Sequence, residues 1–217
     1  MRGLTRPRKR SGRESDRAMK VIGLAGASGT GKTTIAEHLE KRGGRHIDAD
    51  RIAHELLVND DSVVRAIERR FGREVFTGGT IDRKKLGAVV FGDRRALADL
   101  NAIVHPAVME ECRRRIGECE KAGTTLAVVD AALLLDVSAP FEIDLVIALR
   151  AERGERERRL LEKGGAERGE IAARLDSQAR LEESFDRADV VVDTTGPLAD
   201  VLAAIERAVD ELLSRDS

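Results

Sequence analysis

The stretch Gly26-Ala-Ser-Gly-Thr-Gly-Lys-Thr33 decides the fold. It matches the phosphate-binding pattern G-x-x-x-x-G-K-[ST], which requires a strand before it and a helix after it. Both are expected, because residues 20–25 form an apolar run and residues 33–41 place their apolar side chains on one helical face. The glycines allow successive N–H groups to point at an anion, and the dipole of the following helix favours the same negative charge. The stretch therefore predicts a P-loop.

Two side chains of this loop are expected to carry chemistry. Lys32 would reach the β- and γ-phosphates of a nucleotide, and the Thr33 hydroxyl would be a ligand of Mg²⁺. A second metal ligand, Asp130, ends a strongly apolar strand at 124–130. The residues of the loop expected to bind ATP are Gly26, Ser28, Gly29, Thr30, Gly31, Lys32, Thr33 and Thr34.

Strand and helix patterns alternate along the chain. Short apolar runs at 20–25, 46–48, 124–130, 144–149 and 189–193 are separated by helical patterns. The runs are apolar throughout rather than alternating, as in parallel strands that are covered on both sides. The sequence therefore predicts a three-layer α/β fold with a five-stranded parallel sheet and helices on both faces.

The fold is expected to form one domain, residues 19–217. Its core would comprise residues 19–60, 122–150 and 187–217. Residues 61–121 carry helical patterns and little strand signal, which indicates a helical insertion. Residues 151–186 are rich in charged residues and helix formers, and Gly164-Gly165 interrupts them. Residues 1–18 carry seven basic and two acidic side chains and are expected to be a disordered basic extension.

Composition excludes several functions. The whole chain has a net charge of −1 and an aromatic content of 2%, with no Trp or Tyr, so a stacking platform for nucleic acid is not expected. No apolar run approaches the ~20 residues that span a bilayer, and residues 1–18 lack the apolar core of a secretory signal. We expect a cytoplasmic monomer that binds neither nucleic acid nor membranes.

The loop alone does not separate kinases from other nucleotide-binding proteins. The guanine-reading sequence N-K-x-D of GTPases is absent, and D-x-x-G occurs only at Asp193, after the last expected strand. A hydrolytic ATPase usually carries a Glu beside the metal-side Asp to activate water, whereas Ala131 follows Asp130. The pattern therefore favours phosphoryl transfer to a bound acceptor.

Asp48 and Asp50 come at the end of the second expected strand. The carboxyl ends of strands face the ligand crevice in open α/β sheets, so Asp50 is a candidate base for the proton of an attacking hydroxyl. An alternative is that Asp50 is only the N-cap of a following helix at 51–57. The residues alone leave both readings open.

The ordered set of motifs resembles the dephospho-CoA kinase family. The resemblance rests on the P-loop and on a run of later pieces: Ile47-Asp48-Ala49-Asp50, Phe71-Gly72, Asp82-Arg83, His105-Pro106, Leu133-Leu134, Arg159-Leu160, Arg174 with Gln178, and Ala188-Asp189. It spans Lys20 to about Leu213 and implies a P-loop kinase-like fold. It also implies ATP-dependent phosphorylation of the ribose 3′-hydroxyl of dephospho-CoA, with ATP and Mg²⁺ as cofactors.

The same resemblance implies roles for individual residues. Asp50 matches the catalytic base, and Arg159 matches a catalytic arginine in a lid at 151–186. Lys163 takes the place of a second lid arginine at the ATP site. The helical insertion matches the CoA-binding part of the family. The residues that match substrate contacts are Asp48, Asp82, His105, Pro106, Leu133 and Asp136. An alternative for His105 is that it only caps a helix at 107–121.

Several positions depart from the family pattern. Ala132 and Asp136 replace a proline and a glutamate after the third strand, and Thr194 replaces an asparagine near the adenine. Lys163 keeps the charge of an arginine but not its bidentate fork. Two alternatives stay open. The altered 132–136 loop would fit a P-loop kinase that acts on a nucleoside, nucleotide or sugar, and the basic arm at 1–18 would fit a nucleotide-binding regulatory protein.

Overall fold

The structure is a computed structural model, and it describes residues 4–5, 18–90 and 92–214. The chain divides into two compact units. The first, which we call the core unit, contains the chain up to Asp48 and again from Arg115 onwards. The second, the helical unit, is Ala49–Arg114. The sequence predicted a helical insertion with different limits, at 61–121.

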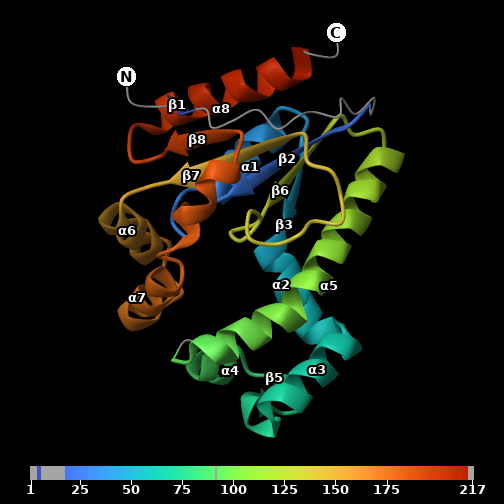
Figure 1. The fold of residues 1–217 in the computed structure, drawn as a ribbon, viewed down its shortest axis with the longest axis vertical. Coiled ribbons are helices and arrows are strands. Elements are labelled where there is room, and N and C mark those ends of the chain that lie inside the picture. The colour runs from blue at the N-terminus through green and yellow to red at the C-terminus, as the bar shows by residue number, and fades with distance from the viewer. Residues whose placement is uncertain (1–3, 6–17, 91, 215–217) are drawn as a thin grey trace. The chain divides into compact units, whose positions relative to one another are not determined.

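The core unit is built on a sheet whose five parallel strands lie in the order β8-β7-β2-β6-β3 among the described residues (Figure 1). The five strands are β2 (Lys20–Ala25), β3 (Arg45–Asp48), β6 (Leu126–Asp130), β7 (Leu145–Arg150) and β8 (Val190–Asp193). The predicted parallel sheet is confirmed. Its carboxyl ends place the P-loop after β2 next to Asp130 at the end of β6.

An additional short strand borders this sheet. β1 (Leu4–Thr5) pairs antiparallel with β8, with Leu4 opposite Val192 and Thr5 opposite Val191. The prediction of a disordered extension at 1–18 therefore does not hold for these two residues. Backbone pairing to an edge strand needs no particular side-chain pattern, so the basic composition gave no signal for it. Residues 1–3 and 6–17 of the predicted extension lie outside the described residues.

Alternate residues of β7 show how both faces of the sheet are covered. Leu145, Ile147 and Leu149 pack into the core beneath α1 (Lys32–Lys41) and α8 (Leu198–Leu213). Val146 and Ala148 face the other way, toward the segment η2 (Leu181–Arg187) and the loop after β6. This burial on both faces explains why the strands are apolar throughout.

Gly23 in the central strand β2 allows a close approach on the second face. A Cβ atom at this position would lie 2.3 Å from the Leu134 side chain and 3.3 Å from Ile143. The loop between β6 and β7 therefore packs directly on the backbone of β2. This contact fixes the start of the 131–136 segment, which the sequence had linked to substrate.

The helical unit contains four helices and a small hairpin within its described residues. Its helices are α2 (Ala49–Asn59), α3 (Asp61–Phe71), α4 (Arg83–Val90) and the first part of α5 (Arg94–Lys121). A 3₁₀ turn η1 (Arg73–Val75) precedes the hairpin of β4 (Phe76–Thr77) and β5 (Thr80–Ile81). Gly78 and Gly79 both have positive φ, as a two-residue hairpin turn requires. Strands this short leave almost no periodic signal, so the hairpin was not predicted.

The helix α5 begins earlier than the sequence indicated. The alternative role of His105 was to cap a helix at 107–121, but α5 starts at Arg94 and continues through Pro106. The Asp93 carboxylate accepts hydrogen bonds from the backbone N–H groups of Arg95 and Ala96 and thereby caps the true start. Proline usually ends a helix, which explains the misplaced boundary.

The charged segment at 151–186 folds as helices within the core unit. α6 (Arg153–Lys163) and α7 (Arg168–Ser177) are separated at Gly164 and Gly165, whose φ angles are +69° and +85°. We call residues 151–186 the lid segment. Across the part of the chain that the structure describes, no helix is both long and apolar enough to cross a membrane.

Candidate functional site

The P-loop between β2 and α1 depends on glycine at three positions. Gly26, Gly29 and Gly31 have φ angles of +134°, +82° and +89°. A Cβ atom would lie 2.3 Å from the Leu149 carbonyl oxygen at Gly26, and 2.7 Å from the Arg156 carbonyl oxygen at Gly29. Gly31 is the N-cap of α1, so the positive end of that helix opens into the loop. The conformation is an anion nest of the predicted kind.

Lys32, Thr33 and Asp130 meet beside this nest. Lys32 Nζ lies 3.8 Å from Asp130 Oδ1, and the Thr33 hydroxyl donates to Asp130 Oδ2 at 3.3 Å. Lys32 and Asp130 are 8% and 5% exposed, so their charges are held in a largely desolvated place. The structure therefore brings together the predicted phosphate-binding lysine and both predicted metal ligands.

His46 on β3 is a further group at this cluster, and the sequence gave it no role. Its Nε2 atom lies 3.7 Å from Asp130 Oδ2 and has no hydrogen-bond partner among the described residues. The Asp130 carboxylate raises the pKa of His46 above its ordinary value, although burial opposes the shift. Asp48, two residues further along β3, is paired in register with Asp130.

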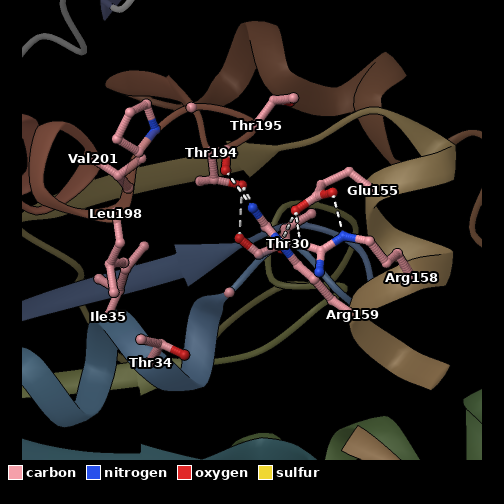
Figure 2. Close-up of a pocket in the computed structure, with 13 residues that line it drawn as sticks. Thr30, Thr34, Ile35, Glu155, Arg158, Arg159, Thr194, Thr195, Leu198 and Val201 are labelled. Carbon is pink, nitrogen blue, oxygen red and sulfur yellow. Dashed lines mark hydrogen bonds and ion pairs between the residues drawn. The ribbon is translucent and has the colours of Figure 1, made fainter. Parts of the chain in front are cut away.

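A pocket of about 520 Å³ adjoins the P-loop (Figure 2). Ile35, Leu198 and Val201 lie on one side, and Glu155, Arg158 and Arg159 on the other. Thr30, Gly31 and Thr34 of the P-loop region and residues 194–197 complete the lining. The pocket thus offers an apolar wall and a cationic wall on either side of the phosphate-binding loop.

Arg159 and Thr194 connect the lid segment to the P-loop. Arg159 Nη2 donates to the Thr194 carbonyl oxygen at 2.6 Å, and its Nη1 donates to the Gly29 carbonyl oxygen at 3.3 Å. The buried Thr194 hydroxyl lies 2.9 Å from the Thr30 carbonyl oxygen and donates to it. Thr194, where the resemblance implied an asparagine, therefore ties the end of β8 to the P-loop.

Glu155 orients both arginines of the cationic wall. It accepts from Arg158 Nη2 at 2.6 Å and from Arg159 Nε at 2.8 Å. Hydrogen bonds from Arg158 and then from Arg159 lower the pKa of Glu155 to about 2. Glu155 is therefore ionised at neutral pH.

Comparisons with known proteins agree with this geometry. The sequence model of the family described as dephospho-CoA kinase matches residues 20–200. The chain belongs to the dephospho-CoA kinase family. A dephospho-CoA kinase from Corynebacterium efficiens is 37% identical over 91% of this chain and 99% of its own length. One from Corynebacterium glutamicum is 38% identical over 89% of this chain and its full length. A crystal structure from Thermus thermophilus superposes with a TM-score of 0.69 at 30% identity, covering 89% of this chain and 98% of that one.

Two family positions lie in the loop after β6. Leu133 is half-buried and its carbonyl oxygen accepts from the Asp136 backbone N–H at 2.9 Å, which closes a turn. The Asp136 carboxylate accepts a hydrogen bond from the Ser184 hydroxyl. A residue of η2 therefore holds the Asp136 side chain. The sequence of this loop did not predict that contact.

The other family positions are distributed along the helical unit. Asp50 is exposed. Because it is the second residue of α2, it lies inside the first turn and is not the N-cap. Asp82 caps α4, because its Oδ1 accepts from the Lys84 N–H at 3.0 Å, and its Oδ2 accepts from the Thr77 hydroxyl. His105 is half-buried and Pro106 is exposed, both within α5. Burial lowers the pKa of His105.

Lys163, the one predicted ATP-binding residue outside the P-loop region, does not line the pocket. It is the last residue of α6 and is exposed. Arg158, to which the sequence gave no role, lines the pocket. Several arginines are spaced three or four residues apart along α6, and this spacing alone does not show which of them faces the pocket.

Proposed function

We propose that the protein transfers the γ-phosphoryl group of ATP to the ribose 3′-hydroxyl of dephospho-CoA. The observation that supports this proposal most strongly is the P-loop nest, with Lys32, Thr33 and Asp130 beside it and a nucleotide-sized pocket adjoining it. Membership of the dephospho-CoA kinase family supplies the acceptor. The absence of a glutamate after Asp130 agrees with transfer to a hydroxyl rather than to water.

In this proposal the nucleotide lies between the two walls of the pocket. The base would lie against Ile35, Leu198 and Val201, where burying its faces is favourable. The triphosphate would follow the backbone N–H groups of the P-loop to Lys32. Arg159, oriented by Glu155 and by Thr194, would stand beside the phosphates and stabilise the charge that develops on them.

The cluster at the end of β6 fits Mg²⁺. Thr33 and Asp130 present a hydroxyl and a carboxylate oxygen 3.3 Å apart, and hard oxygen donors of this kind suit the ion. Thr33 and Asp130 would hold the ion, whose charge would offset part of the negative charge of the phosphates. Asp130 also holds Lys32 near the loop, so one carboxylate would serve both cations of the site.

The transfer itself needs a group that accepts the proton of the attacking hydroxyl. The ribose 3′-oxygen attacks the γ-phosphorus, the bond from that phosphorus to the β,γ-bridging oxygen breaks, and ADP leaves. We assign the proton to Asp50, which follows the last residue of β3 by two positions and is exposed at the start of α2. The proposal further assigns acceptor binding to Asp48, Asp82, His105, Pro106, Leu133 and Asp136.

Analysis of the product tests the proposal. The protein is incubated with ATP, Mg²⁺ and dephospho-CoA, and the product is examined by mass spectrometry and ³¹P NMR. We expect one added phosphate, coupled to the ribose H3′ proton. A phosphate at another position would contradict the assigned acceptor atom, and ADP with inorganic phosphate alone would indicate hydrolysis.

The metal assignment predicts a defect in Asp130→Asn. The amide keeps the shape of the side chain but removes the charge that faces Thr33 and Lys32, so Mg²⁺ affinity should fall by about tenfold or more. The affinity is measured with Mn²⁺ by electron paramagnetic resonance in the presence of ADP, together with the Mg²⁺ dependence of turnover. Asp210→Asn, at an exposed acid of α8 that pairs with Arg42, is the matched control. Unchanged Mn²⁺ binding in Asp130→Asn would refute the assignment.

A further inference from the structure

The lid segment holds a single residue of the P-loop from both sides. Arg156 Nε donates to the Ser28 carbonyl oxygen at 2.9 Å. The Ser28 backbone N–H donates to Gln178 Oε1 at 2.8 Å. Both polar groups of the Ser28 backbone are therefore bound by side chains that lie far along the chain, one from α6 and one from the residue after α7.

These contacts are made in a tightly packed place. Arg156 is 6% exposed and Ser28 is 8% exposed. The backbone of α6 lies directly on the next P-loop residue, because a Cβ atom at Gly29 would be 2.9 Å from Arg156 Cα. Within the described part of the chain, both side chains hydrogen-bond to the Ser28 backbone and not to a charged group at the surface.

Burying Arg156 is costly. Its Nη2 atom is buried and has no hydrogen-bond partner among the residues that the structure describes. Burial lowers the pKa of its guanidinium, while Glu182 acts in the opposite direction. An apolar side chain at this position would avoid these costs. What it would not provide is the hydrogen bond to Ser28, which is therefore the reason we give for a buried arginine here.

The P-loop needs such support because of its composition. Gly26, Gly29 and Gly31 give the loop its positive φ angles, but glycine also leaves it with more conformational freedom than any other residue would. A ligand that binds a mobile loop must order it, and this lowers the affinity. Contacts that fix the loop beforehand remove that cost.

We propose that Arg156 and Gln178 are positioning residues that hold the P-loop in its nucleotide-binding conformation through the backbone of Ser28. The Ser28 N–H is used by Gln178, so the N–H groups left for phosphate are those of the following residues. The conformation of the loop then depends on the lid segment. This inference rests on the proposed binding of ATP at the P-loop, but it concerns residues that the proposed reaction does not use.

Variants of both residues test this role. Gln178→Leu removes the acceptor for the Ser28 N–H, and Arg156→Met removes the donor to its carbonyl while keeping an extended side chain. Hydrogen–deuterium exchange should become faster in peptides that contain Ser28 and Gly29, and not in peptides of α8. The affinity for a fluorescent ADP should fall by about tenfold, the size expected for losing a buried hydrogen bond. The KM for ATP should rise while the KM for dephospho-CoA stays unchanged.

Matched variants separate positioning from a general loss of structure. Gln178→Glu keeps an acceptor oxygen and should restore slow exchange at Ser28. Arg153→Met, at an exposed residue of the same helix that pairs with Asp176, should leave exchange and ADP affinity unchanged. If Arg156→Met fails to fold, Gln178→Leu at a half-buried position decides the question alone.

The outcomes distinguish this inference from the proposed function. Wild-type exchange at Ser28 and wild-type ADP affinity in Gln178→Leu would overturn the positioning role, even in an active kinase. Failure of the wild-type protein to bind ADP would instead contradict the proposed function. The exchange measurement needs no nucleotide, so it would still report whether the two side chains hold the loop.

Discussion

Replacing Lys32 with alanine is expected to lower kcat by about 10²–10³-fold, the usual cost of removing one group that stabilises transition-state charge. Lys32 follows the N-cap of α1 and is largely buried beside the P-loop nest. Its ammonium would contact the phosphates whose charge changes during transfer. The rates are measured with saturating ATP and dephospho-CoA, and thermal unfolding is recorded for the same samples.

A second lysine of the same helix provides the control. Lys41 is the last residue of α1 and is exposed, so Lys41→Ala should leave kcat unchanged. Lys32→Ala also leaves Asp130 without its cation at 3.8 Å, and a change in unfolding temperature would reveal any cost in stability. Near-normal turnover in a folded Lys32→Ala protein would contradict the P-loop assignment.

Replacing Asp50 with asparagine is expected to lower kcat by about 10²–10⁴-fold, the usual contribution of a positioned general base. Asparagine has nearly the same shape but does not accept a proton at neutral pH. Because Asp50 is exposed and is assigned no contact with ATP, the affinity for ATP should stay the same. The comparison of kcat with the dissociation constant for ATP, measured by titration, therefore separates a base from a binding residue.

The alternative role of Asp50 is to stabilise the start of α2. A carboxylate in the first turn of a helix contributes about 0.3–1 kcal/mol through the helix dipole. Asp61 is likewise exposed in the first turn of α3, so Asp61→Asn measures that contribution in the same unit. Equal losses of stability in both variants, with turnover lost only in Asp50→Asn, would support the base. A loss of stability without a kinetic defect would support the structural role.

The sheet was predictable because its strands are simple. Burial on both faces makes β2, β6 and β7 continuous apolar runs, and the P-loop glycines mark the turn after β2. The register of parallel strands then places Asp48 beside Asp130. The cluster of Lys32, Thr33 and Asp130 follows from the motif and from the rule that parallel strands end at one edge.

The contacts of the lid segment were not predictable in the same way. Residues 151–163 alternate basic and acidic side chains at helical spacing, which is also the pattern of a solvated surface. Only tertiary packing shows that Arg156 is buried against Ser28, that Arg159 reaches Thr194, and that Lys163 is exposed. His46 gave no signal either, because a single polar residue in a short strand fits an exposed or a buried position equally well.

The roles of residues at helix starts were hard to predict, because the same side chain can cap a helix or contact a ligand. His105 was a candidate cap for a helix at 107–121, but Asp93 caps the helix and α5 starts at Arg94. Asp82 was assigned to substrate by resemblance, and the structure shows that its carboxylate also caps α4. Side-chain caps of this kind depend on local hydrogen bonds that a sequence pattern does not specify uniquely.

The acceptor of the phosphoryl group is the most direct test of the account. ADP release is measured with ATP and Mg²⁺ and with a panel of acceptors: dephospho-CoA, phosphopantetheine, nucleoside monophosphates, shikimate and gluconate. The account predicts ADP release with dephospho-CoA and only background release with the others. Turnover with another acceptor and none with dephospho-CoA would contradict it, while leaving the fold and the nucleotide site in place.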